Sequence, residues 1–147
     1  MLIRPYHETD FSALCQIFQR AVRETASQHY SASQIAAWAQ IDETRWRQKM
    51  ADSLVLVATA GNRPVGFVTA VGTYIDLLFV DPAYSRQGIA SALLRELCTQ
   101  IPAGTLTAEA SLTAKACFER QGFQVTAQQE VEARGEYFVN YRMEKVR

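Results

Sequence analysis

Cysteine and histidine are scarce in this chain of 147 residues, and their scarcity argues against several kinds of site. The three cysteines, Cys15, Cys98 and Cys117, are an odd number and lack the spacing of metal ligands. Each lies in an apolar helical pattern, so we expect reduced core thiols, as in a cytoplasmic protein, and no metal. With only two histidines, a catalytic pair of cysteine and histidine is not indicated.

An excess of charge of one sign is also lacking, since 15 Lys and Arg balance 15 Asp and Glu. The sequence therefore shows no basic footprint for nucleic acid and no basic amphipathic helix for a membrane surface. No apolar run is long enough to span a membrane, and the first residues lack a signal peptide's apolar stretch. We expect a cytoplasmic protein with neither partner, folded as a single domain over residues 1–147 around a core supplied by 48% hydrophobic residues.

Apolar periodicity predicts helices and strands in the order βααα-βββ-α-β-α-ββ. A first helix, capped by Thr9 or Asp10, is expected to run to about Ala26. Gly66 either weakens its strand or allows close approach of another element. The predicted strands are 2–5, 54–60, 65–71, 74–80, 105–108, 125–133 and 136–143. Four further helices are predicted: one capped by Ser33, one starting at Asp42 or Thr44, one over 89–101 that ends at Pro102-Ala103-Gly104, and one from Ser111 to Gly122.

The stretch from Val80 to Leu94 carries the strongest functional signal. An apolar strand ends at Asp81-Pro82, and a short polar loop runs directly into a helix whose first turn is small and uncharged. Backbone N–H groups and the positive end of the helix dipole converge at such a junction and bind phosphate. Gly88 has no Cβ, so a ligand can approach the backbone closely. The stretch matches neither G-x-x-x-x-G-K-[ST] nor G-x-G-x-x-G, the two common nucleotide-binding motifs.

The same stretch resembles the pyrophosphate loop of the GCN5-related N-acetyltransferases (GNAT), whose pattern is [QR]-x-x-G-x-[GA]. Gly88 and Ala90 match the last two positions, whereas Ser85 stands where Gln or Arg is usual and Arg86 lies one place along. A second segment, 114–123, resembles the family's A-x-x-[LF]-Y-E-K-x-G-F. The predicted element order is similar to the family's fold along the whole chain, and the Tyr-Ile-Asp-x-Leu strand resembles that of small uncharacterised bacterial acetyltransferases.

This resemblance implies an α+β fold, the GNAT acyl-CoA N-acyltransferase fold. We expect a mixed central sheet of about seven strands, flanked by helices and splayed between the fourth and fifth strands. It implies transfer of an acetyl group from acetyl-CoA to a primary amine of a small molecule or peptide, by direct attack in a ternary complex. Ser111 alternatively serves only as a helix N-cap, and Arg86 only as a solvated loop residue. The residues implied to bind coenzyme A are Leu78, Phe79, Val80, Ser85, Arg86, Gln87, Gly88, Ile89, Ala90, Ser91, Ser111 and Phe118.

Proton transfer is where the sequence departs from the family. The family's general acid is a Tyr in the second motif, and Phe118 occupies that position. Tyr141 and Tyr74 are candidate replacements or ordinary packing residues, and a thiol with a pKa of about 8.5 also leaves tolerably well unaided. Asp76 is the candidate base, because it is the sole carboxylate in an apolar strand and is expected to share the face of Leu78. A structural pairing of Asp76 is the alternative.

Polar and aromatic residues near the break after the first helix are candidates for binding the acceptor. These are Glu24, His29, Tyr30 and Trp38, although Trp38 alternatively packs between helices. A second hypothesis is a coenzyme A-binding module that is catalytically weak or inactive, with a regulatory or interaction role, which Phe118 and Ser85 favour. A third is a homodimer that pairs through the aromatic strand 137–141 of the terminal hairpin.

Overall fold

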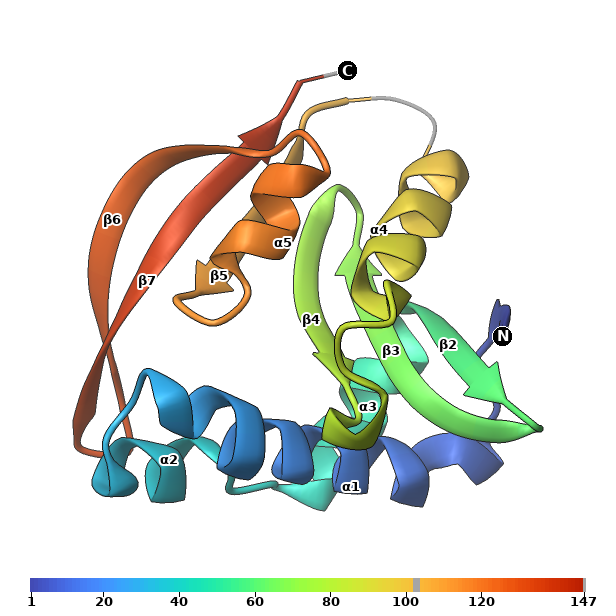
Figure 1. Ribbon diagram of the computed structural model, residues 1–147, viewed down its shortest axis with the longest axis horizontal. Coiled ribbons are helices and arrows are strands. Elements are labelled where there is room, and N and C mark those ends of the chain that lie inside the picture. The colour runs from blue at the N-terminus through green and yellow to red at the C-terminus, as the bar shows by residue number, and fades with distance from the viewer. Residues whose placement is uncertain (102–103, 147) are drawn as a thin grey trace.

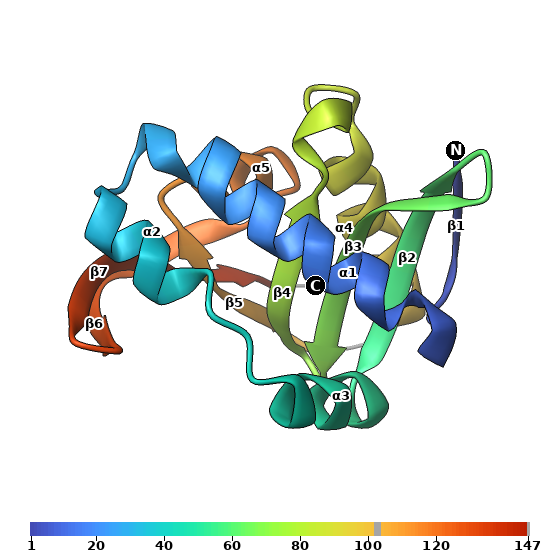
Figure 2. The same ribbon diagram turned by 90° about the horizontal axis from the view of Figure 1, so that it is seen from below.

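The structure is a computed structural model that describes residues 1–101 and 104–146. One seven-stranded sheet has the order β1-β2-β3-β4-β5-β7-β6, and helices lie on both of its faces (Figures 1 and 2). Neighbouring strands are antiparallel except for β4 and β5, which are parallel. The α+β fold with a mixed sheet is thus confirmed. The strands are β1 (Leu2–Pro5), β2 (Leu54–Ala60), β3 (Arg63–Val71), β4 (Tyr74–Val80), β5 (Leu106–Ser111), β6 (Gln124–Ala133) and β7 (Glu136–Lys145), and the helices are α1 (Phe11–Arg20), α2 (Ala32–Trp38), α3 (Glu43–Asp52), α4 (Ile89–Gln100) and α5 (Lys115–Arg120).

Two apolar clusters hold the helices to the sheet, one on each face. On one face, α1 buries Leu14 and Phe18 against Val57 and Phe67 of the sheet. On the other face, α4 supplies a stripe that repeats every three or four residues, as the helical period requires. Leu93, Leu94 and Leu97 of this stripe are fully buried. Among the described residues, no helix is both long and apolar enough to cross a lipid bilayer.

Gly66 in β3 allows α4 to pack directly on the sheet. A Cβ atom built at this position would lie 3.1 Å from Cγ2 of Ile89 and 3.2 Å from the carbonyl oxygen of Phe79. Both contacts are tighter than side chains ordinarily make, so a larger residue would push the first turn of α4 outward. The expectation of close approach at Gly66 is confirmed.

The sheet opens between β4 and β5, as the resemblance implied. Only two residue pairs join these strands, Tyr74 with Thr107 and Ile75 with Ala108. Beyond Ile75 the two strands diverge (Figure 1), while β4 continues its pairing with β3 as far as Val80. On the side that faces β5, Leu78, Phe79 and Val80 therefore have no strand partner in the described part of the chain.

A β-bulge in β4 changes the face on which Asp76 lies. Thr69 pairs with Leu77 and Ala70 with Ile75, so Asp76 is the extra residue of the bulge. The hydroxyl of Thr69 accepts a hydrogen bond from the N–H of Leu77 at 3.1 Å and stabilises the bulge. Asp76 forms an ion pair with Lys49 of α3, whereas Leu78 packs in the opposite cluster with α4. The expectation that Asp76 shares the face of Leu78 is wrong, because it assumed unbroken alternation.

Several element boundaries differ from those predicted. The first helix continues after Arg20 as a π-helical turn, 21–25, and then a 3-10 turn, 26–28. Ser31 rather than Ser33 caps α2, because its hydroxyl accepts the N–H of Gln34. Neither Thr9 nor Asp10 caps α1 through its side chain; Asp10 instead pairs with Arg4. Pro102-Ala103, the predicted terminator of α4, lies outside the described residues.

The last two corrections concern the C-terminal third of the chain. β5 extends to Ser111, so Ser111 ends a strand, and its hydroxyl accepts the N–H of Ala114 before α5 begins at Lys115. β7 pairs with β5 on one side and with β6 on the other. The segment 137–141 therefore cannot pair with a second copy as an edge, since β6 is the outer strand.

Candidate active site

The loop after β4 starts at a buried, paired carboxylate. Only 3% of the Asp81 side chain is exposed, and its Oδ2 lies 2.9 Å from Nη1 of Arg20 in α1. Its Oδ1 accepts the N–H of Ala83 at 3.0 Å, which caps the 3-10 turn 82–84. Asp81 thus fixes the direction in which the loop leaves the sheet.

The rest of this loop presents backbone to solvent at the N-terminus of α4. Residues 85–88 are exposed, and Arg86 and Gly88 have φ values of 61° and 77°. Gly88 is the N-cap residue of α4 and offers no side chain to the free N–H groups of the first turn. A Cβ atom at Gly88 would meet nothing within 4 Å, so the space above these amides is open. This geometry can bind an anion of the size of a phosphate.

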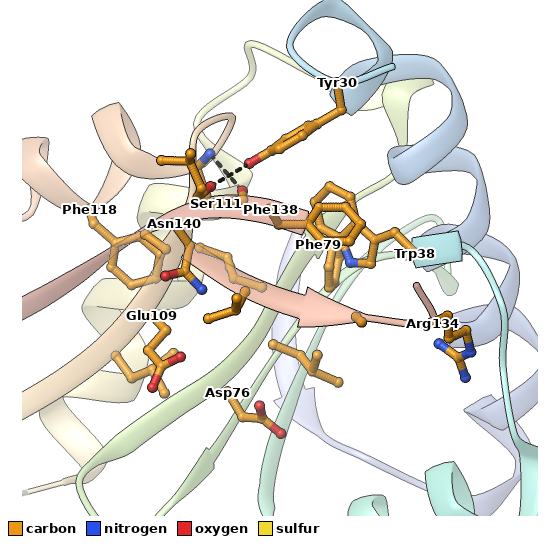
Figure 3. Close-up of a pocket in the computed structure, with 18 residues that line it drawn as sticks. Tyr30, Trp38, Asp76, Phe79, Glu109, Ser111, Phe118, Arg134, Phe138 and Asn140 are labelled. Atoms are coloured by element: carbon orange, nitrogen blue, oxygen red, sulfur yellow. Dashed lines mark hydrogen bonds between the residues drawn. The ribbon is translucent and has the colours of Figure 1, made fainter. Parts of the chain in front are cut away.

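A cavity of about 250 Å³ lies where β4 and β5 diverge (Figure 3). We call it the β4–β5 cavity. Its walls are β4 from Ile75 to Phe79, the end of β5, the start of α5, and the hairpin of β6 and β7 that faces α2. The lining residues are Tyr30, Trp38, 75–79, 109–111, Ala114, Phe118, Val131, Ala133, Arg134 and 138–140.

Two carboxylates line the cavity on the side away from Tyr30 (Figure 3). Oδ2 of Asp76 lies 2.8 Å from Nζ of Lys49, while Glu109 is exposed on β5. Burial, and then the negative charges of Glu109 and Asp76, raise the pKa of Tyr74 to about 12. Among the described residues, no cluster of three or more His, Cys, Asp or Glu could hold a metal ion.

Aromatic rings cover the opposite end of the cavity. Tyr30 and Trp38 meet edge to face with ring centroids 5.4 Å apart, and Phe79 and Phe138 each contact Trp38. The Tyr30 hydroxyl accepts the N–H of Leu112 at 2.9 Å and donates to the carbonyl of Val139 at 3.3 Å. Burial is the main reason why the pKa of Tyr30 is raised. Tyr30 thus ties the loop before α2 to both β7 and the loop after β5.

The structure brings some of the predicted residues into this cavity and leaves others outside it. Predicted residues that line it are Tyr30, Trp38, Asp76, Leu78, Phe79, Ser111 and Phe118. Outside the lining, His29 contacts Thr113, Glu24 pairs with Arg20, and the Tyr141 ring lies under Nζ of Lys115. Tyr74 also lies outside it. Phe118 is buried and packs edge to face on Phe123 at 5.2 Å.

Sequence reasoning missed three polar residues of the cavity: Glu109, Arg134 and Asn140. Glu109 follows the strand predicted to end at Ala108, so a longer strand would have placed it on the sheet. Asn140 lies two residues after the buried Phe138, and that spacing puts both on one face. The Oδ1 atom of Asn140 is buried and has no hydrogen-bond partner among the described residues. No local signal in the sequence singles out Arg134.

Comparison with known proteins gives consistent results. The profile of a family described as "Acetyltransferase (GNAT) domain" matches residues 26–145. "Uncharacterized N-acetyltransferase YafP" of Escherichia coli K12 is 56% identical over 141 residues, which are 96% of this chain and 93% of YafP.

Solved structures are similar over nearly the whole chain. A GCN5-related N-acetyltransferase from Rhodopseudomonas palustris superposes with a TM-score of 0.95 at 30% identity, over 99% of this chain and 95% of that one. The PaiA N-acetyltransferase from Thermoplasma acidophilum, crystallised with coenzyme A, has a TM-score of 0.77 at 17% identity, over 99% and 98% of the two chains. At this lower identity the likeness shows the fold.

Proposed function

The chain belongs to the GNAT family of acetyltransferases, and from that membership we propose that it moves the acetyl group of acetyl-CoA to a primary amine. The acceptor is a small molecule or a peptide, the attack is direct in a ternary complex, and residues 1–147 act as one domain. The observation that carries this proposal is the unpaired side of β4, which borders the β4–β5 cavity and leads to the exposed loop 85–88 at the N-terminus of α4.

The residues present fit coenzyme A. An extended pantetheine arm can add to the free side of β4 at Leu78, Phe79 and Val80 as a peptide strand would. The free Oδ1 of Asn140 can accept a hydrogen bond from an amide of that arm. The diphosphate fits over residues 85–91, and Arg86 adds a positive charge there. PaiA of Thermoplasma acidophilum shows that this fold accommodates the cofactor.

Acetyl-CoA supplies the activated acyl group as a thioester, and the protein holds it and removes a proton from the amine. Backbone N–H groups of β4 can polarise the thioester carbonyl in the manner of an oxyanion hole. A lysine-like amine with a pKa of about 10.4 is almost entirely protonated at neutral pH, so a base is needed. We assign this role to Asp76, with Glu109 as the second candidate, because both carboxylates line the cavity.

Release of the thiol does not depend on residue 118, because phenylalanine has no proton to donate. Tyr141 and Tyr74 remain the proposed donors, and since neither lines the cavity, each must act through water. A pKa of about 12 keeps Tyr74 protonated throughout the neutral range. We propose that Tyr30 and Trp38 form the acceptor wall of the cavity, and Glu24 and His29 stay proposed acceptor residues although they lie outside its lining.

The test is to mix the protein with acetyl-CoA and a panel of primary amines and to follow the free thiol. Turnover with at least one amine, together with a rise in melting temperature on adding coenzyme A, is the expected result. A rise in melting temperature without turnover on any amine would support the second candidate, a binding module with lost catalysis. Two observations favour that candidate, the absent phenol at Phe118 and the ion pair that occupies Asp76.

A homodimer remains a prediction, and the structure changes where it would form. The outer strand β6 has exposed residues along nearly all of its length, so it is the edge that a second copy would meet. Sedimentation of the wild type and of a variant with Val125→Pro in β6 would test it. A mass that corresponds to one chain for both proteins would exclude the dimer.

A further inference from the structure

A second hollow adjoins the β4–β5 cavity on the side of α3. It has a volume of about 550 Å³, and we call it the α3 groove. Trp38, Asp76, Leu77 and Arg134 line both the groove and the cavity, so these four residues form the boundary between the two. A ligand whose reacting amine lies at Asp76 can therefore extend past this boundary into the groove.

Three acidic and three basic side chains line the groove, and two of the three cations have no ion-pair partner among the described residues. Its carboxylates all have partners: Asp42 caps α3, Asp52 accepts from the amide of Gln48, and Asp76 pairs with Lys49. Within residues 1–101 and 104–146, by contrast, no carboxylate lies within ion-pair distance of Arg45 or Arg134. Both guanidinium groups line the groove.

Arg134 is the better placed of the two for a ligand in the cavity. It lies at the tip of the β6–β7 hairpin with φ of 50°, and its Nη1 donates to the carbonyl of Ala37 at 3.4 Å. This contact holds the hairpin tip against the end of α2. A guanidinium has five N–H donors, so most of them remain for a ligand. Figure 3 shows Arg134 at the rim of the cavity, on the same side of Trp38 as Asp76.

We propose that Arg134 binds an anionic group of the acceptor, so that the preferred acceptor is an amine that also carries a carboxylate or a phosphate. The guanidinium plane matches either oxyanion with two parallel hydrogen bonds, while Asp76 and Glu109 receive the amine. Simple alkylamines and polyamines lack the group that Arg134 binds and are poorer substrates. This inference rests on the proposed function, because it assigns the substrate class of that same cavity.

The test compares amines that differ only in the anionic group. One pair is 5-aminopentanoate and pentylamine, and the other is 2-aminoethyl phosphate and ethylamine, so the two arms separate carboxylate from phosphate. In the wild type we expect kcat/KM to favour the anionic member of at least one pair by about 10- to 100-fold, the range of a charge-assisted hydrogen bond. Arg134→Gln should bring that ratio close to one, and Arg134→Lys should retain part of it. Arg95→Gln, on the exposed face of α4, is the matched control and should keep the ratio.

A binding measurement makes the outcome independent of turnover. With coenzyme A present, 5-aminopentanoate or 2-aminoethyl phosphate should raise the melting temperature of the wild type more than its neutral counterpart, and Arg134→Gln should abolish the difference. Equal kcat/KM values and equal shifts within both wild-type pairs would overturn the inference while leaving the acetyltransferase activity standing. If no amine is acetylated, the proposed function fails, and the melting temperatures alone decide whether the anionic group is recognised.

Discussion

The ammonium of Lys49 lies 2.8 Å from Oδ2 of Asp76, so a cation of the protein already occupies the carboxylate proposed as the base. The pair is partly solvated, with 38% of the Lys49 side chain and 22% of the Asp76 side chain exposed. An acceptor ammonium must compete with Lys49 for this carboxylate or use Glu109 instead. The roles of these residues can therefore be separated by substitution.

Asp76→Asn should lower kcat by about 10²- to 10⁴-fold, the usual contribution of a general base, while the affinity for coenzyme A stays unchanged. Steady-state kinetics and a titration of coenzyme A measure the two quantities. Glu109→Gln is the matched comparison, because it also removes one carboxylate from the cavity wall. A larger loss of kcat in Glu109→Gln than in Asp76→Asn would identify Glu109 as the base. If Asp76→Asn lowers kcat and the affinity for coenzyme A equally, the role of Asp76 is structural.

Lys49→Met should lower the KM for the amine by about two- to five-fold, the equivalent of a partly exposed ion pair. The methionine removes the competing ammonium but keeps a long apolar side chain at this position of α3. Lys145→Met, at the end of β7, is the control and should leave the KM unchanged. If Lys49→Met raises the KM, the lysine assists the acceptor rather than competing with it.

Gly88→Glu should abolish the rise in melting temperature that coenzyme A causes. The added Cβ meets no atom within 4 Å, so no clash is expected, and the change adds a carboxylate at the proposed anion site together with the strain of a side chain at the positive φ of 77°. Gly88→Gln is the control, because glutamine has the size of glutamate and meets the same strain at the positive φ of this position without adding charge. A full response to coenzyme A in the glutamate variant would place the diphosphate elsewhere.

The alkaline stability of the protein should depend on Tyr74. Its pKa is raised from 10.0 in the unfolded chain to about 12 in the folded protein, first by burial and then by Glu109 and Asp76. The folded state thus holds the proton more tightly, and this contribution to stability is complete below pH 10 and disappears as the pH rises through 12. Urea unfolding from pH 9 upward should show a smaller loss of stability for Tyr74→Phe than for the wild type.

Tyr6 provides an independent check of the same reasoning. Its pKa is also raised to about 12, by burial and by Glu8, on the opposite side of the sheet from α4. Tyr6→Phe should flatten the pH dependence in the same direction, and the double variant should flatten it further. Stability curves that run parallel for all four proteins would contradict the assigned pKa values.

Arg20→Met should destabilise the protein by about 1 to 3 kcal/mol, because it leaves the buried carboxylate of Asp81 without its ion-pair partner. It should also weaken coenzyme A binding, since Asp81 sets the path of the loop at 82–88. Glu24→Gln removes the other, exposed partner of Arg20 and should change the free energy of unfolding by less than about 1 kcal/mol. Equal effects of the two substitutions would mean that Asp81 does not need Arg20.

Sequence patterns predicted the elements because these depend on local periodicity. The apolar stripe of α4 repeats with the helical period, and the turn at Arg134-Gly135 separates two alternating strands, so both were found close to their observed bounds. Caps were less predictable, since Ser31 and Ser33 are chemically equivalent and only backbone geometry selects Ser31. The bulge at Asp76 left no signal, because it arises from the register between β3 and β4.

The residues of the cavity likewise divide into those that the sequence indicated and those that only the structure showed. Phe118 and Ser111 were identified through a motif, and Tyr30 and Trp38 through their composition near a helix break, and all four line the cavity. Arg134 was missed because it is 58 residues from Asp76 in sequence, and the two share a cavity only when the terminal hairpin folds back over α2. A pattern read along the chain contains no information on such a contact.

The amino-acid sequence by itself determined the order of the elements, the junction of loop and helix at Gly88 and the family resemblance, since each rests on residues close together in the chain. Only the tertiary structure decided which face Asp76 occupies, that Lys49 is its partner, and that Glu109, Arg134 and Asn140 meet in one cavity. The physical reason is that strand register, the opening between β4 and β5, and the packing of the hairpin on α2 all depend on contacts between distant segments.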